Sequence, residues 1–257
     1  MPAETVLITG ASSGIGEALA RIFAADKSNL VLVARSKQKL ARLAEEIRGA
    51  EGVEVRVAAH DLAEPGAAGA IFEELAGEGV SIDVLVNNAG FGAAGALASL
   101  PAPRQLEMIQ VNVASLAHLT RLFLPGMLAR NRGGILNVAS IAAFQPGPNM
   151  AVYCASKAFV LSLSEALVEE LATTGVRVTC LCPGPTATGF AAEAAMEHTL
   201  LFRMGMMDAR TVAAAGHRAF RRGQAVAIPG IGNKLLAFSV RLAPRIVVRK
   251  IADFLLR

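Results

Sequence analysis

A glycine-rich turn between a first apolar strand and a first helix constrains this chain more than any other feature. A β-branched apolar run at residues 5–9 leads into Gly10, Gly14 and Gly16, and a segment of helical period follows at 14–25. Gly10 can adopt a tight turn, Gly14 lets a ligand approach the backbone, and Gly16 permits close packing of the helix. The first N–H groups of a helix have no intrahelical partner, so this turn predicts a phosphate site.

The rest of the chain repeats the alternation of strand and helix. Apolar runs typical of strands lie at residues 5–9, 30–33, 53–58, 82–86, 134–138, 176–182 and 225–228. Segments of helical period lie between them at 14–25, 36–48, 65–76, 103–130 and 151–173. This order predicts an α/β fold, a doubly wound, Rossmann-like sheet of seven parallel strands with helices on both faces.

Length and composition limit the classes of protein that fit. A chain of 257 residues with 53% hydrophobic residues suits a single domain spanning 1–257. The formal charge of +4 is spread along the chain except at its C-terminus, so nucleic-acid binding is not expected. We expect neither a signal peptide nor a transmembrane helix, because the first strand begins almost at once and no run of about 18 apolar residues occurs.

The cysteines indicate the compartment. Cys154, Cys180 and Cys182 are odd in number, form no C-x-x-C pair and have no histidines near them at ligand spacing. A reducing, cytoplasmic location is expected, and no metal site. Cys180 and Cys182 stand two apart in a strand and therefore share one face as small buried residues.

The turn predicts a dinucleotide site, with contacts from Gly10, Ser12, Ser13, Gly14, Ile15 and Gly16. Where an acidic residue after the second strand would bind the adenosine ribose hydroxyls, this chain has Ala34 followed by Arg35. A guanidinium can pair with a 2′-phosphate, which favours NADP(H) over NAD(H). The alternative is that Arg35 is only a solvated loop residue before the next helix.

Two further segments follow strands at the same edge of the predicted sheet. Asp61 and Leu62 follow the third strand, where the Asp61 carboxylate either faces the adenine amino group or caps a helix, two roles of equal standing. Asn87-Asn88-Ala89-Gly90 ends the fourth strand and can lay Asn88, Ala89 and Gly90 against the cofactor, although such residues also make ordinary turns.

The reacting groups are expected on one helix and the strand before it. Tyr153 and Lys157 stand four apart, hence on one helical face, where an ammonium would lower the pKa of the phenol. Ser140 ends the fifth strand and can orient a carbonyl oxygen. Asn112 can hold a water that links Lys157 to solvent. Taken alone, the tyrosine and lysine would more simply be neighbours on an amphipathic helix.

Together these motifs resemble the short-chain dehydrogenase/reductase family, in its compact single-domain branch, over residues 5–228. The resemblance implies a catalytic tetrad of Asn112, Ser140, Tyr153 and Lys157, with Tyr153 and Lys157 also touching the cofactor. It implies further cofactor contacts from Pro183, Gly184, Thr186 and Thr188. Members with a basic residue after the second strand prefer NADP(H), as Arg35 suggests here.

The function expected from this resemblance is hydride transfer between NADP(H) and a small-molecule ketone or secondary alcohol, with Tyr153 donating or accepting the proton. The runner-up within this class is a 3-oxoacyl thioester reductase of fatty-acid metabolism. An alternative from another class is a catalytically silent NADP(H)-binding sensor or scaffold.

Two late segments do not belong to the repeating pattern. Residues 184–207 are irregular and contain Met196, Met204, Met206 and Met207, which suit a mobile lid over an apolar substrate. Residues 232–257 form a basic helical tail that Pro244 interrupts. The tail could lie on an anionic membrane surface, but contact with a sister subunit ranks first, because family members are commonly homodimers or homotetramers.

Overall fold

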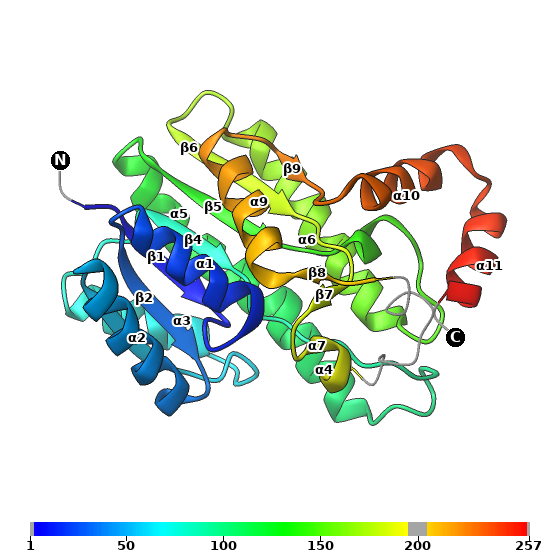
Figure 1. Ribbon diagram of the computed structural model, residues 1–257, viewed down its shortest axis with the longest axis horizontal. Coiled ribbons are helices and arrows are strands. Elements are labelled where there is room, and N and C mark those ends of the chain that lie inside the picture. The colour runs from blue at the N-terminus through cyan, green and yellow to red at the C-terminus, as the bar shows by residue number, and fades with distance from the viewer. Residues whose placement is uncertain (1–2, 195–204, 256–257) are drawn as a thin grey trace.

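Seven parallel strands form the centre of the computed structural model, which describes residues 3–194 and 205–255 (Figure 1). The strand order is β3-β2-β1-β4-β5-β6-β9, so the order reverses direction between β1 and β4. The bounds are β1 (Thr5–Thr9), β2 (Asn29–Ala34), β3 (Val55–Ala59), β4 (Val84–Asn87), β5 (Gly133–Val138), β6 (Val176–Leu181) and β9 (Val226–Ala227). The predicted fold class is confirmed, and each predicted strand is present to within a few residues at its ends.

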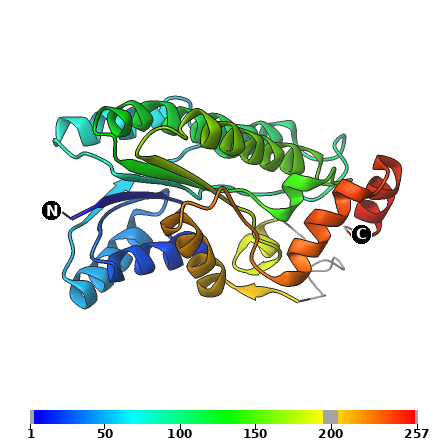
Figure 2. The ribbon, with the colours of Figure 1, turned by 90° about the horizontal axis from the view of Figure 1, so that it is seen from above.

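Helices cover both faces of the sheet (Figure 2). One layer contains α1 (Gly14–Ala25), α2 (Lys37–Glu51) and α9 (Ala209–Arg221). The other contains α3 (Ala67–Gly77), α4 (Ala102–Ile109), α5 (Leu116–Ala129) and α6 (Ala151–Glu170). Side chains alternate along each strand, so Val6 and Ile8 pack under the first layer and Leu7 under the second. The strands are buried on both faces and therefore read as continuous apolar runs.

The helical segment predicted at 103–130 is divided in the structure. A π-helical segment, η1 (Gln110–Ser115), separates α4 from α5. A π segment inside an α-helix is rare and is frequent at functional sites. It contains Asn112, the candidate residue of this region, and nothing in the apolar spacing of the sequence indicates it.

Helix α6 is long and apolar enough to cross a membrane by length and composition. Its polar residues Ser156, Lys157 and Ser164 are buried, and it packs against β6. A core helix can have the same length and composition, and these contacts show that α6 is a core helix.

The chain after β6 has more regular structure than the sequence predicts. The short strands β7 (Thr186–Ala187) and β8 (Met207–Asp208) pair as a separate two-stranded sheet, and α7 (Phe190–Glu193) follows β7. Met206 is exposed and Met207 half-buried, whereas Met196 and Met204 lie outside the described residues. The tail forms α10 (Ile231–Leu242) and α11 (Arg245–Leu255), and the break before Pro244 is as predicted.

We predict that Phe23→Ala lowers the free energy of unfolding by about 3–5 kcal/mol, because it leaves a cavity between α1 and α9. Phe23 is fully buried and contacts the rings of His217 and Phe220 edge-on. Urea unfolding followed by circular dichroism measures the change. Phe254→Ala is the control: its side chain is exposed, so its effect should stay within about 0.5 kcal/mol. Equal effects of the two changes would contradict this assignment of the core.

Candidate active site

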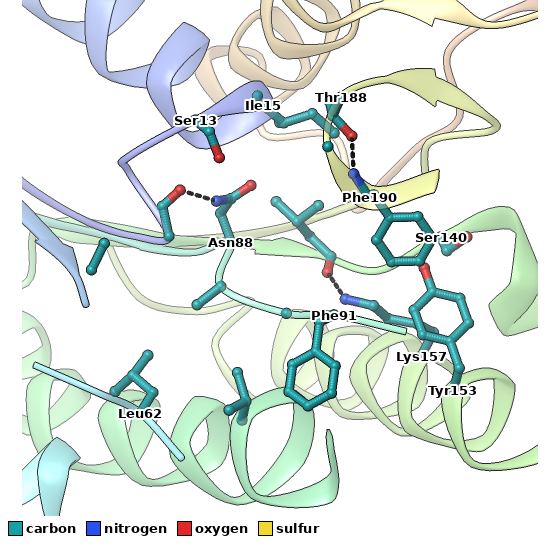
Figure 3. A pocket seen from close by; sticks show the side chains of 18 of the residues that line it. Ser13, Ile15, Leu62, Asn88, Phe91, Ser140, Tyr153, Lys157, Thr188 and Phe190 are labelled. Atoms are coloured by element: carbon teal, nitrogen blue, oxygen red, sulfur yellow. Dashed lines mark hydrogen bonds between the residues drawn. The ribbon is translucent and has the colours of Figure 1, made fainter. Parts of the chain in front are cut away.

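A cavity of about 650 Å³ lies at the carboxyl ends of the strands, beside the point where the strand order reverses (Figure 3). In open parallel sheets ligands bind at this place. Eighteen of the residues predicted from the sequence line it: Gly10, Ser12, Ser13, Gly14, Ile15, Arg35, Asp61, Leu62, Asn88, Ala89, Gly90, Ser140, Tyr153, Lys157, Pro183, Gly184, Thr186 and Thr188. Two predicted residues, Gly16 and Asn112, do not line it.

The three glycines of the first turn are each required by a separate constraint. Gly10 and Gly14 have φ values of 64° and 60°, a region that residues with a Cβ rarely adopt. A Cβ at Gly14 would also lie 2.9 Å from Cγ2 of Thr188 across the cavity. A Cβ at Gly16 would collide with the carbonyl of Gly10 and the amide of Asn88. Gly16 therefore serves helix packing and not ligand contact.

Hydrogen bonds from Thr9 and Asn88 hold this turn against the end of β4. The Thr9 hydroxyl donates to the Val86 carbonyl (3.2 Å) and accepts from the backbone N–H of Asn88 and of Ala89 (both 3.0 Å). The Asn88 side chain donates to the carbonyls of Thr9 (2.8 Å) and Gly10 (3.2 Å). Asn88 thus binds the glycine turn directly, which the sequence motif alone did not reveal.

The far end of the cavity is basic. Arg35 is exposed there, and Lys39, in the first turn of α2, also lines the cavity. Ser36 caps α2 by accepting from the N–H of Lys39, which fixes where that helix begins. Lys39 was not predicted from the sequence as a residue of this site, although its position four residues after Arg35 could have indicated that the two side chains lie near each other.

The two alternatives for Asp61 separate in the structure. The N-cap of α3 is Gly66, so Asp61 does not cap that helix. Its carboxylate accepts from the N–H of Ala63 (3.0 Å) in the turn after β3, and it lines the cavity. The helix-cap role is wrong, and the cavity-facing role remains.

Tyr153, Ser140 and Lys157 meet at the other end of the cavity. The Tyr153 hydroxyl points toward the Ser140 hydroxyl (Figure 3), and the two share a hydrogen bond. The Ser140 oxygen also accepts from the N–H of Ala142 (3.1 Å), at the start of the 3₁₀ helix η2 (Ile141–Phe144). Lys157 Nζ donates to the Val138 carbonyl (2.9 Å), at the end of β5. The geometry predicted for these three residues is present.

Burial determines the charges of this group. It raises the pKa of Tyr153 well above its usual value, and the hydrogen bond with Ser140 opposes only part of that rise. It lowers the pKa of Lys157 to about 8. The amine lies 5.9 Å from the centre of the Tyr153 ring. The prediction that the phenol has a lowered pKa is wrong for this state of the protein, because burial is the largest cause and raises that pKa.

The Asn112 side chain bonds to the segment that follows β4 and to α6. Its amide accepts from the N–H of Phe91 (3.1 Å) and donates to the Phe91 carbonyl and the Ser156 hydroxyl (both 3.0 Å). The side chain is only 1% exposed. Asn112 therefore fixes the backbone after β4, beside Gly90 and Lys157, and its predicted role in holding a water stays a prediction.

Several apolar residues of the cavity were not predicted from the sequence. The ring of Phe190 packs on Tyr153 with centroids 5.3 Å apart, and Phe91, Val111 and Met150 lie nearby in the lining. The guanidinium of Arg104 stacks on the Phe91 ring at 3.9 Å. These residues come from four separate segments, so no local pattern could have joined them.

The predicted placement of two cysteines is confirmed. Cys180 and Cys182 are buried on one face of β6 and beyond, with sulfur atoms 3.7 Å apart. Within residues 3–194 and 205–255 no cluster of metal-ligating side chains occurs.

A family model described as short chain dehydrogenase matches residues 4–198. The chain belongs to this family. This short-chain dehydrogenase is 40% identical, over 194 residues, to a protein named as ketoacyl reductase 1 of the granaticin polyketide synthase of Streptomyces violaceoruber, and the match covers 75% of the chain and 71% of that relative. It is 39% identical over 188 residues to the very-long-chain 3-oxoacyl-CoA reductase of Anas platyrhynchos, covering 71% of the chain and 59% of the relative.

Solved structures agree with this assignment. A short-chain dehydrogenase from Sphingobium yanoikuyae in complex with NADPH superposes with a TM-score of 0.82 at 32% identity, covering 93% of both chains. A short-chain dehydrogenase/reductase from Burkholderia phymatum in complex with NAD has a TM-score of 0.82 at 30% identity, covering 93% of this chain and 92% of that one. The short-chain dehydrogenase described here is therefore an oxidoreductase with a nicotinamide-cofactor fold.

We predict that Thr9→Val, which keeps the shape of the side chain, lowers the free energy of unfolding by about 1–3 kcal/mol, because the Ala89 N–H loses its acceptor and the Asn88 N–H keeps only the Val86 carbonyl. The glycine turn should shift, and the dissociation constant for the nicotinamide cofactor should rise. Urea unfolding and fluorescence titration with NADPH measure the two effects. Thr173→Val, at an exposed position, is the matched control. If Thr9→Val changed neither quantity, the role of this hydroxyl would be refuted.

Proposed function

We propose that this short-chain dehydrogenase is an NADP(H)-dependent reductase of apolar ketones or 3-oxoacyl compounds. The observation that carries the proposal is the meeting of a phenol, a hydroxyl and a buried amine, Tyr153, Ser140 and Lys157, in one cavity with the glycine turn. Groups that move a proton thus lie in the same space as groups that suit a dinucleotide. Oxidation of the corresponding alcohol would use the same residues.

The residues present fit a dinucleotide. The turn around Gly10 and Gly14 leaves a cradle that a Cβ would fill, and the Ser13 side chain does not cap the N-terminus of α1. Arg35 and Lys39 favour a cofactor with a 2′-phosphate, since no carboxylate follows β2 to repel it. Neighbouring structures hold NADPH in one case and NAD in another, so the preference rests on these two basic residues.

In the proposed reaction the bound cofactor supplies or accepts the hydride. Tyr153 donates a proton from its hydroxyl to the substrate oxygen, and its raised pKa keeps that proton in place before reaction. Ser140 hydrogen-bonds the same oxygen and stabilises its developing charge. Lys157, held by the Val138 carbonyl, places a positive charge near the phenolate that forms. Asn112 positions the backbone of Phe91 and so the wall of the site.

The substrate end of the cavity favours an apolar compound. Phe91, Val111, Met150 and Phe190 line it around Tyr153. The names of the two relatives above, a ketoacyl reductase and a 3-oxoacyl-CoA reductase, favour a 3-oxoacyl thioester within this class. We propose a lid over this end from the segment 184–207, of which residues 195–204 lie outside the described residues; Phe190, which packs on Tyr153, would be its inner residue.

Assembly and compartment complete the proposal. A homodimer or homotetramer is proposed, and the exposed Leu106 and Ile109 on α4 and Phe159 on α6 offer apolar surface for it. Three buried thiols without a disulfide are consistent with the cytoplasm as the proposed location.

We predict that Tyr153→Phe lowers kcat for a 3-oxoacyl thioester or a bulky ketone by about 100-fold or more, because the proton donor is lost. The dissociation constant for NADPH should change less than about threefold. NADPH absorbance at saturating substrate measures turnover, and fluorescence titration measures binding. Ser162→Ala, at an exposed position on the same helix and away from the cavity, is the control variant. Near-normal turnover of Tyr153→Phe would overturn the mechanism.

The same assay separates the enzyme from a silent binder. Wild-type protein that binds NADPH but consumes none across a panel of 3-oxoacyl thioesters, steroid ketones and small ketones would support the sensor or scaffold alternative.

We predict that Arg35→Ala weakens NADPH binding by about 10-fold or more while leaving NADH binding nearly unchanged, because only NADPH carries the phosphate that the guanidinium pairs with. Isothermal titration with each cofactor measures the preference. Arg42→Ala, at an exposed position on the same helix as Lys39, is the control for a general loss of positive charge. An unchanged ratio of the two dissociation constants would show that Arg35 is a solvated loop residue.

A further inference from the structure

The C-terminal helices expose a large apolar surface. On α10, Ile231, Leu235, Phe238 and Leu242 are 58–79% exposed and recur at intervals of four, three and four residues. On a helix this spacing places them in one stripe. Ile246, Val247, Ile251 and Phe254 on α11 are 42–65% exposed, whereas Val248 and Ala252 on the opposite side are buried. One side of α11 is therefore buried, and the other leaves large apolar side chains exposed.

Positive charge is concentrated on the same segment. Residues 231–257 contain six basic residues and one acidic residue, a net charge of +5, whereas the whole chain carries +4. The other 230 residues therefore carry −1. Arg241, Arg249 and Lys250 are exposed beside the apolar side chains, and a groove on α11 is lined by Ile246, Arg249, Lys250, Asp253 and Phe254.

This surface adjoins the rim of the cavity. The Asn233 side chain, in the first turn of α10, contacts Gly184, which lines the cavity. Helix α10 also packs on η2, whose residues Ile141 and Ala142 are in the lining. Both C-terminal helices lie at the end of the molecule where the strands have their carboxyl ends (Figure 2).

We propose that α10 and α11 dock this enzyme on an anionic lipid surface, with the apolar stripe in the headgroup region and the basic residues on lipid phosphates. Exposed apolar side chains flanked by basic ones are the pattern of interfacial helices. A second copy of the same surface fits poorly, because a twofold contact would bring two strongly positive tails together. This reverses the order that the sequence favoured, in which contact with a sister subunit came first.

Docking in this way would bring the cavity rim close to the lipid. An apolar substrate dissolved in the bilayer could then enter without crossing bulk water. The docking itself does not depend on the proposed reaction, since it rests on α10 and α11 alone.

The test is flotation of the full-length protein with vesicles of equal parts phosphatidylglycerol and phosphatidylcholine, and with vesicles of phosphatidylcholine alone. We expect flotation with the anionic vesicles at low salt and its loss at high salt, because exposed charges are screened. R241E/R249E should weaken partitioning by roughly 30-fold or more. R218E/R222E, which makes the same change of net charge at two exposed positions in the last turn of α9 and just after it, is the matched control and should float like the wild type.

A second variant tests the apolar stripe and the rival partner. L235S/F238S should also abolish flotation while leaving NADPH turnover and the mass by light scattering unchanged. Absence of flotation with the wild type, or equal loss in R218E/R222E, would overturn the proposal. A lower mass of L235S/F238S without any lipid binding of the wild type would assign the surface to a second copy. A wild-type protein that floats with anionic vesicles but shows no NADPH turnover would contradict the proposed reaction and leave the docking proposal intact.

Discussion

The hydrogen bonds of the Thr9 hydroxyl join the two strands between which the sheet reverses its order. β1 and β4 run parallel and side by side, and the chain leaves them toward opposite faces of the sheet. Their backbone ladder ends at Ile8 and Val86, and the bonds of Thr9 and Asn88 continue the connection beyond it, where the cavity begins. The Thr9 hydroxyl accepts from two backbone N–H groups after β4, and the Asn88 side-chain amide donates to two carbonyls of the glycine turn. These bonds bring the Gly10 carbonyl and the Asn88 amide so close to Gly16 that a Cβ would not fit there, so this position requires glycine.

The fold and the cofactor side of the site could be predicted from sequence because their signals are local. The signal for the glycine turn lies within residues 10–16, and that for the pair Tyr153 and Lys157 lies within one helical turn. The apolar periodicity of the chain predicts a parallel sheet, and both signals then fall at the carboxyl edge of that sheet. Pairings between distant segments could not be predicted. Phe190 reaches Tyr153 from the chain beyond β6, and Asn112, in the π-helical η1, hydrogen-bonds the backbone of Phe91. Apolar spacing carries no signal for either contact.

The error about the phenol has the same origin. Sequence spacing places an ammonium near Tyr153 but does not state how much water surrounds either group. In the structure both are buried, and burial favours the neutral form of each: the phenol keeps its proton and the amine loses its own more readily. This arrangement suits a proton donor. The charge of Lys157 then matters most after the proton has left, when a phenolate is present to interact with it.

Lys157 also shows what the site costs the fold. Its pKa of about 8, against 10.5 for a free lysine, means that the folded protein binds this proton less tightly than the unfolded chain. The stability contributed by this group is therefore reduced at neutral pH, on the order of 3 kcal/mol, and rises with pH between about 8 and 10.5. Among the described residues, the Val138 carbonyl accepts its one hydrogen bond from the side-chain amine, which can donate three. A ligand that offers further acceptors to this amine would recover part of that free energy on binding, so the same burial that weakens the fold strengthens the site.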